Sequence, residues 1–138
     1  MAKDIFHEAV KKALIKDGWT ITDDPLRLLS KEEGGIETDL GAEKMIIAQK
    51  ELQRIAVEVK SFNNPSLIHD FMRATGQYVS YETAILQKHL NRQMFLAMPY
   101  YVFEKLQLLD FITAVIERFH MKIILYNPEN ETIEEWKI

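Results

Sequence analysis

The chain has 138 residues, 47% of them hydrophobic and 28% charged, and this balance predicts a single globular domain over residues 1–138. It contains no cysteine, which excludes disulfides, thiolate nucleophiles and cysteine-based zinc sites. The formal net charge of −4 counts against strong non-specific binding to nucleic acid, which usually needs a basic excess. No apolar run approaches the ~20 residues that span a bilayer, and charges interrupt the segment where a signal peptide would be apolar. We therefore expect a cytoplasmic protein without a membrane partner.

The first half of the chain is predicted to combine one helix with several strands. Apolar residues recur at helical spacing from Asp4 to Asp17, and Gly18 follows as the helix end. Runs of alternating or β-branched residues then predict strands at residues 19–22, 36–40, 45–49 and 54–60. The polar stretch 50–53 is expected to form a hairpin turn between the last two of these strands.

The second half is predicted to alternate helices with strands. Ser66 can cap a long helix that runs to about Leu90. Apolar patterns then predict, in chain order, a strand at 95–98, helices at 100–107 and 110–119, and strands at 121–126 and 132–138. This order predicts an α/β fold in which a mixed central sheet is flanked by helices on its faces.

The feature that indicates chemistry is Asp39 followed by Glu58, Val59 and Lys60. Glu58 and Lys60 stand two apart on a predicted strand, so their side chains point the same way, and Asp39 could reach the same place. Two carboxylates with carbonyl or water oxygens suit Mg²⁺ or Mn²⁺. A lysine beside them can position a water molecule or stabilise charge on a phosphate. The alternative is a solvent-exposed pair in which Glu58 and Lys60 simply bind each other.

Three further residues are candidates for the same site. Gln77 and Tyr81 are four apart on the predicted long helix, so they share a face that could lean over Glu58 and Lys60. The alternative places Tyr81 in the core with Gln77 at its margin. Glu8 on the first helix is another carboxylate, and its alternative is a solvated helical glutamate.

Several stretches of the sequence resemble a known family. The opening AKDIFHEAVKKALIKDGW, the stretches DLGAEK and IAVEVKSF, and the later HDFMRATGQYVSY are together similar to XisH, the fdxN element excision controlling factor proteins of cyanobacteria. The resemblance covers nearly the whole chain. That family is similar in turn to the PD-(D/E)XK nucleases, which implies a restriction-endonuclease-like core.

The resemblance also implies an active site. Its residues would be Asp39, Glu58 and Lys60 as the motif, Glu8 as a further metal ligand, and Gln77 and Tyr81 as the Gln-x-x-x-Tyr element of RecB-like branches. Thr38 stands where the motif name has proline. The cofactor would be Mg²⁺ or Mn²⁺, and the activity would be that of an endodeoxyribonuclease.

We therefore expect an accessory factor that controls programmed site-specific excision of a DNA element and retains a metal-dependent phosphodiesterase site. Its expected partners are DNA and an XisI-like protein. The alternative is a non-catalytic module with a nuclease-like fold that docks DNA or a partner protein, and a subunit of a toxin–antitoxin-like pair is a third interpretation. An apolar surface also predicts a homodimer or partner interface, formed by Phe95, Tyr100, Tyr101, Phe103 and Phe111.

Overall fold

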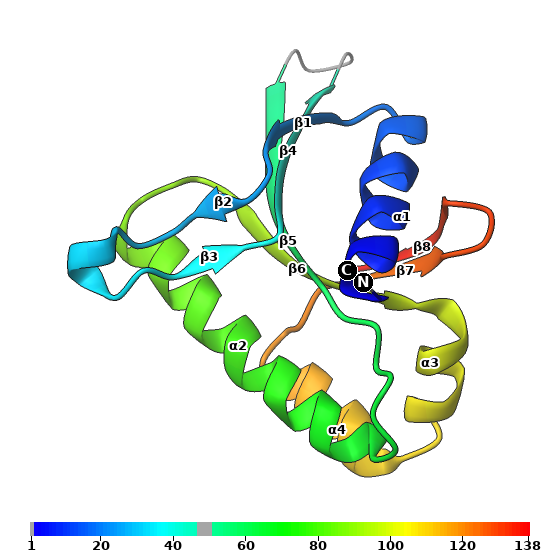
Figure 1. Cartoon of the computed structure of the whole chain (residues 1–138). Coiled ribbons are helices and arrows are strands. Elements are labelled where there is room, and N and C mark those ends of the chain that lie inside the picture. The colour runs from blue at the N-terminus through cyan, green and yellow to red at the C-terminus, as the bar shows by residue number, and fades with distance from the viewer. Residues whose placement is uncertain (1, 47–50) are drawn as a thin grey trace.

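The computed structural model describes residues 2–46 and 51–138, and its central feature is a six-stranded sheet (Figure 1). The strands lie in the order β1 (Thr20–Asp23), β4 (Leu40–Ile46), β5 (Glu51–Val59), β6 (Gln93–Pro99), β7 (Ile123–Asn127) and β8 (Thr132–Lys137). β6 is parallel to both β5 and β7. The pairs β1–β4, β4–β5 and β7–β8 are antiparallel, so the sheet is mixed, as the sequence predicts.

Helices cover both faces of this sheet (Figure 1). One face packs against α1 (Ala2–Lys16), and the other against α2 (Leu67–Gln87), α3 (Tyr100–Leu106) and α4 (Asp110–Arg118). A short 3₁₀ helix, η1 (Lys31–Glu33), lies between the short strands β2 (Leu26–Arg27) and β3 (Glu37–Thr38). The predicted fold class is therefore confirmed. No helix in the described part of the chain is long and apolar enough to cross a membrane.

The alternation of side chains along β5 decides what faces each layer. Ile55 and Val57 point to the core beneath α1, whereas Ala56 belongs to the core beneath α2. Because successive strand residues point to opposite faces, Glu58 lies on the α2 side with Ala56. Glu58 pairs in register with Leu96 of β6, so it stands in the interior of the sheet rather than at an edge.

The expected strand at 36–40 is wrong as a single strand. Glu37–Thr38 forms β3, which pairs only with β2 (Leu26–Arg27) in a separate two-stranded ribbon, and β4 begins at Leu40. Asp39 falls at the break between the two sheets. A physical reason is that its side chain, rather than its backbone, takes up the backbone N–H of Val59.

The expected hairpin turn at 50–53 is also wrong over its described residues. Residues 51–53 continue β5 and pair with residues 44–46 of β4. Polar side chains are tolerated there because this end of β5 is accessible to solvent: Leu52 is exposed and Gln53 is half-buried. Lys50 and residues 47–49 of the expected strand at 45–49 lie outside the described residues.

Candidate active site

A hydrogen bond joins the Asp39 side chain to the backbone of β5. The Oδ2 atom of Asp39 accepts the backbone N–H of Val59 at 2.7 Å. The break between β3 and β4 therefore places one carboxylate next to the other, although 19 residues separate them in the sequence.

Glu58 and Lys60 form an ion pair with 3.3 Å between Nζ and Oε2. Glu58 is only 7% exposed, so the predicted alternative of a solvated surface pair does not describe it. Lys60 follows the last residue of β5, and its backbone is fixed on both sides. Its N–H donates to the carbonyl of Ala97 at 2.9 Å, and its carbonyl accepts the hydroxyl of Tyr126 at 3.4 Å.

The electrostatics of Glu58 are those of a crowded buried acid. Burial, followed by the negative charge of Asp39, raises the pKa of Glu58 to about 7, and Lys60 opposes the shift without cancelling it. Near neutral pH, the carboxyl group is thus divided between its protonated and ionised forms. Two neighbouring carboxylates whose charges are incompletely balanced are a suitable donor set for a hard divalent cation such as Mg²⁺ or Mn²⁺.

The α2 helix brings Tyr81 to the same region. Burial raises the pKa of Tyr81 to about 12, and the charges of Glu58 and Asp39 contribute to this shift, so the phenol lies close enough to sense both carboxylates. The helix is held at its start by Ser66, whose Oγ accepts the N–H of His69 at 3.3 Å, as the sequence predicts. Further along, the Tyr78 hydroxyl accepts the N–H of Lys122 at 3.0 Å and donates to the carbonyl of Met94 at 3.3 Å.

Two polar atoms near this region are buried without a hydrogen-bond partner among the described residues. They are the Oε1 atom of Gln77 and the Oγ1 atom of Thr38. Thr38 directly precedes Asp39, and Gln77 lies one helical turn before Tyr81. Buried polar groups normally find partners, so these two leave hydrogen-bonding capacity that the described chain does not use.

The structure does not bring Glu8 to the other two carboxylates. Glu8 is exposed on α1, and no group of three His, Asp or Glu side chains in residues 2–46 and 51–138 could hold a metal ion. The physical reason is helical periodicity. Val10 and Leu14 define the buried face of α1, and Glu8 is two positions from Val10, which is more than half a turn away.

A residue of α1 does reach the candidate site, but it is His7 rather than Glu8. It lines a cleft of about 290 Å³ together with Asp39 and Lys60, and its Nε2 atom is 2.8 Å from Oδ1 of Asp24. His7 was not among the site residues predicted from the sequence. The signal was available, because His7 is three positions before Val10 and so shares its face of the helix.

The fold and the site define a mixed α/β protein with an Asp and Glu-x-Lys cluster where a central strand ends. The chain belongs to the XisH family: the family model described as "XisH protein" matches residues 1–134. The sequence-based resemblance to that family is confirmed. None of the curated proteins matches the chain.

Two solved structures are similar to this chain over almost its whole length. One is a crystal structure of a fdxN element excision controlling factor protein from Anabaena variabilis, with 39% sequence identity and a TM-score of 0.84, covering 98% of this chain and 99% of that one. The other is an XisH family protein from Nostoc punctiforme PCC 73102, with 36% identity and a TM-score of 0.82, covering 98% and 100%.

Proposed function

We propose that this protein is an accessory factor in the programmed site-specific excision of a DNA element, acting in the cytoplasm, and that it carries a metal-dependent DNA phosphodiesterase site. The first part is supported by membership of the XisH family and by the relative from Anabaena variabilis, which is described as an excision controlling factor. The second part is supported by the site. An endonuclease of the PD-(D/E)XK type is the enzyme class that this arrangement fits.

One observation carries the phosphodiesterase proposal: Glu58 is buried beside Asp39, and its pKa is raised to about 7. Holding two acids together in this way is unfavourable for the isolated chain, and a divalent cation would relieve it. Asp39 and Glu58 would hold Mg²⁺ or Mn²⁺, with water and phosphate oxygens completing the coordination, as is usual for Mg²⁺. When bound, the ion would supply Lewis-acid stabilisation of the negative charge on the phosphate.

The other residues of the site would bind and orient the substrate. Lys60 is 26% exposed and lines the cleft next to Asp39, so its ammonium group can contact a phosphate while it remains near Glu58. It would stabilise charge that develops on the phosphate or hold the attacking water in position. Gln77 and Tyr81 would orient the Lys60 side chain or the substrate strand.

The test is cleavage of plasmid, linear and branched DNA in the presence of Mg²⁺ or Mn²⁺. The wild type is expected to cut at least one of these forms. Lys60→Ala should lose the activity by orders of magnitude, while Lys105→Ala, an exposed lysine on α3, should retain it. Equal activity in the two variants would remove Lys60 from the mechanism, and a wild type that cuts nothing would contradict the enzymatic part of the proposal.

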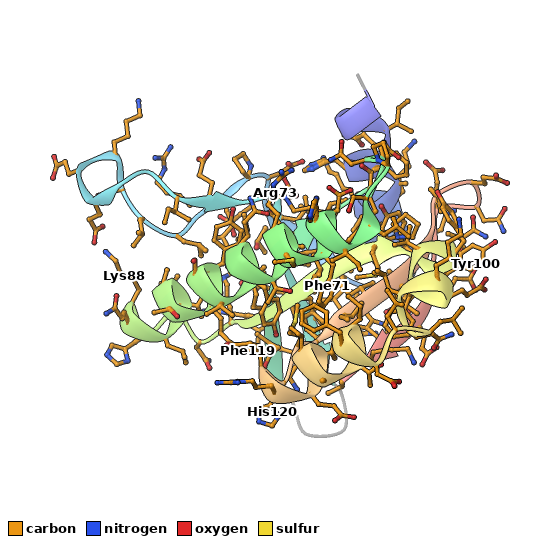
Figure 2. The ribbon with its side chains drawn as sticks, turned by 90° about the horizontal axis from the view of Figure 1, so that it is seen from below. Phe71, Arg73, Lys88, Tyr100, Phe119 and His120 are labelled. Carbon is orange, nitrogen blue, oxygen red and sulfur yellow. The ribbon has the colours of Figure 1, made fainter. Side chains whose placement is uncertain are left out.

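A second candidate function is a non-catalytic interaction module, and an apolar groove between α2 and α4 favours it. The groove has a volume of about 430 Å³, and its exposed walls include Met72, Phe111 and Phe119. Gly76 also lines it, and a Cβ atom added there would meet nothing within 4 Å, which leaves room for another backbone to approach. Figure 2 shows α2 and α4 side by side, with Phe119 on α4's side of α2.

One of the residues expected at an interface, Phe95, is wrong. Phe95 is 1% exposed and belongs to the core beneath α1, because it points from the centre of the sheet. Phe111 is exposed as expected, at 55%, but its neighbours come from α2 rather than from residues 100–103. We propose a second copy of the chain as the occupant, since a two-fold dimer requires only this surface itself. An XisI-like protein is the alternative occupant.

A further inference from the structure

A second polar cleft adjoins the candidate active site. It has a volume of about 190 Å³ and is lined in part by Arg73 and Asn64. The cleft that contains Asp39 and this second cleft share three lining residues: Lys60, Ser61 and Asn63. The two clefts are therefore neighbours along the segment that links β5 to α2.

That segment is anchored, so the relative positions of the two clefts are fixed. Phe62 is buried in the core beneath α2 and adopts a φ of 58°, a left-handed conformation that is uncommon for a residue other than glycine. The next turn is held by Asp70, whose two carboxylate oxygens accept the backbone N–H of Asn64 at 3.2 Å and its side-chain amide at 2.7 Å. Asp70 lines the second cleft as well, but both of its oxygens are engaged by the loop.

Arg73 differs from the other arginines of the chain. Arg27, Arg54 and Arg92 each form an ion pair with an acidic side chain. Arg118 lies over the ring of Phe119. Arg73 is exposed and makes neither an ion pair nor a hydrogen bond with any residue in the described ranges. Its guanidinium group is thus available to a ligand.

The position of Arg73 on α2 directs it to the active-site side. Arg73, Gln77 and Tyr81 follow one another at intervals of four residues, so they lie along one face of the helix. The cleft that Arg73 lines shares Lys60 with the cleft that contains Asp39, so this face of the helix is turned towards the candidate site. Figure 2 shows Arg73 on the side of α2 that is opposite to Phe119 and the apolar groove.

We propose that the Arg73 cleft is a second phosphate subsite, which binds a phosphate neighbouring the one held at Asp39, Glu58 and Lys60 on the same nucleic-acid strand. This inference rests on the proposed function. Each strand carries one negative charge per ~3.4 Å of helix axis, so a strand at Lys60 presents a further phosphate within reach of a long arginine side chain. The planar guanidinium group can donate two parallel hydrogen bonds to a phosphate, which fixes the direction of the strand.

The subsite also fits the overall acidity of the protein. With a net charge of −4, the chain has no general attraction for nucleic acid, so binding must depend on a few locally placed cations. Lys60 and Arg73 both line the second cleft, and the acidic residue there is bonded to the loop. Removal of either cation should therefore affect binding more than removal of a cation elsewhere on the surface.

The test measures the affinity for a labelled oligonucleotide as a function of KCl concentration, with Ca²⁺ in place of Mg²⁺ to prevent cleavage. In Arg73→Gln, the slope of log K against log [KCl] should become smaller by about 0.9 for a duplex or about 0.7 for a single strand, which is the loss of one phosphate contact. Arg118→Gln makes the same change of charge on α4 and should keep the wild-type slope. Arg73→Lys should keep the slope but bind more weakly, because it retains the charge and loses the bidentate geometry.

The outcomes separate this inference from the function on which it rests. If the wild type binds DNA and Arg73→Gln keeps its slope, the subsite is wrong and the proposed function is unaffected. Equal losses in Arg73→Gln and Arg118→Gln would also overturn the subsite, since they would indicate a diffuse electrostatic effect. A wild type that binds no oligonucleotide overturns the proposed function and the subsite together. Glutamine and arginine have similar helix propensities, so Arg73→Gln should fold, and circular dichroism checks this.

Discussion

Asp39 accepts a hydrogen bond from the backbone N–H of Val59 at 2.7 Å, across the point where the chain leaves one sheet and enters another. This contact replaces a ladder hydrogen bond with a bond to a carboxylate. As a result, Asp39 is held within electrostatic range of Glu58, and its negative charge adds to the effect of burial, which is the larger cause of the raised pKa of Glu58. The same local geometry therefore explains the break in the strand and contributes to the raised pKa of Glu58.

The raised pKa of Glu58 predicts how the metal-free protein depends on pH. The pKa is about 7 in the folded protein and 4.5 as the reference value, so the folded state binds this proton more tightly than the unfolded state. The resulting stability is present in full below about pH 4.5 and is lost as the pH rises to about 7. At about 1.4 kcal/mol for each pH unit between the two pKa values, the loss should reach about 3 kcal/mol.

Urea unfolding in EDTA between pH 4.5 and pH 8 measures this effect. Because other acids also titrate at the low end, the quantity to compare is the difference in unfolding free energy between the wild type and Glu58→Gln. As the pH rises, the unfolding free energy of the variant should increase relative to that of the wild type. A difference that stays constant across the range would mean that Lys60 balances the charge of Glu58.

Tyr78 predicts a structural effect that is separate from the chemistry. Its hydroxyl joins α2 to β6 and to the start of β7 through Met94 and Lys122, and the side chain is 1% exposed. Tyr78→Phe leaves the N–H of Lys122 without this partner, so the free energy of unfolding should fall by about 1 to 3 kcal/mol. Thermal or urea unfolding measures it, with the exposed Tyr101→Phe as the control, which should change little.

The groove between α2 and α4 predicts self-association. The wild type should be a dimer at micromolar concentration in light scattering coupled to gel filtration. Phe111→Ser should be monomeric, because it removes the most exposed aromatic side chain of the groove. Ile15→Ser, on the exposed side of α1, is the matched control and should remain dimeric. A monomeric wild type would exclude the second copy as occupant and leave the XisI-like partner to be tested.

The sequence predicted the sheet well because its signals are local. Alternation in β5 and the apolar runs of β6 and β7 specify buried strands, and the cap at Ser66 specifies where α2 begins. Breaks that depend on partners far along the chain were not predictable. The division at Asp39 arises from its bond to Val59, which is 20 residues away.

The same contrast between local and distant signals holds for the site residues. Glu58, Lys60 and Tyr81 could be placed because strand and helix periodicity fix the directions of their side chains. Glu8 was misplaced because the periodicity of α1 turns it to the exposed side, whereas His7 lines the cleft that contains Asp39. Arg73 was not selected, since nothing in the sequence shows which cations have partners in the folded protein.

The last prediction separates an enzyme from an interaction module through Glu58→Gln, which keeps the shape of the side chain and removes its charge. If Asp39 and Glu58 bind a metal, the metal-free variant should be at least as stable as the wild type near pH 7, because one of two crowded charges is gone. If Glu58 instead serves mainly as the buried partner of Lys60, its removal should destabilise the protein, because Lys60 would lose its counter-charge.

Mg²⁺ supplies the independent readout for the same variant. Binding to the folded state alone should stabilise the wild type by RT ln(1 + [L]/Kd), which is about 2.7 kcal/mol at a hundredfold excess over Kd. Glu58→Gln should lose this gain, because it lacks one of the two carboxylates proposed to hold the metal. Its cleavage activity should also fall by orders of magnitude, because the activity depends on that metal. Glu134→Gln, an exposed glutamate on β8, should keep both. A wild type that gains no stability from Mg²⁺ or Mn²⁺ and cuts no form of DNA would show that Asp39 and Glu58 do not bind a divalent cation. The interaction module would then be the remaining function.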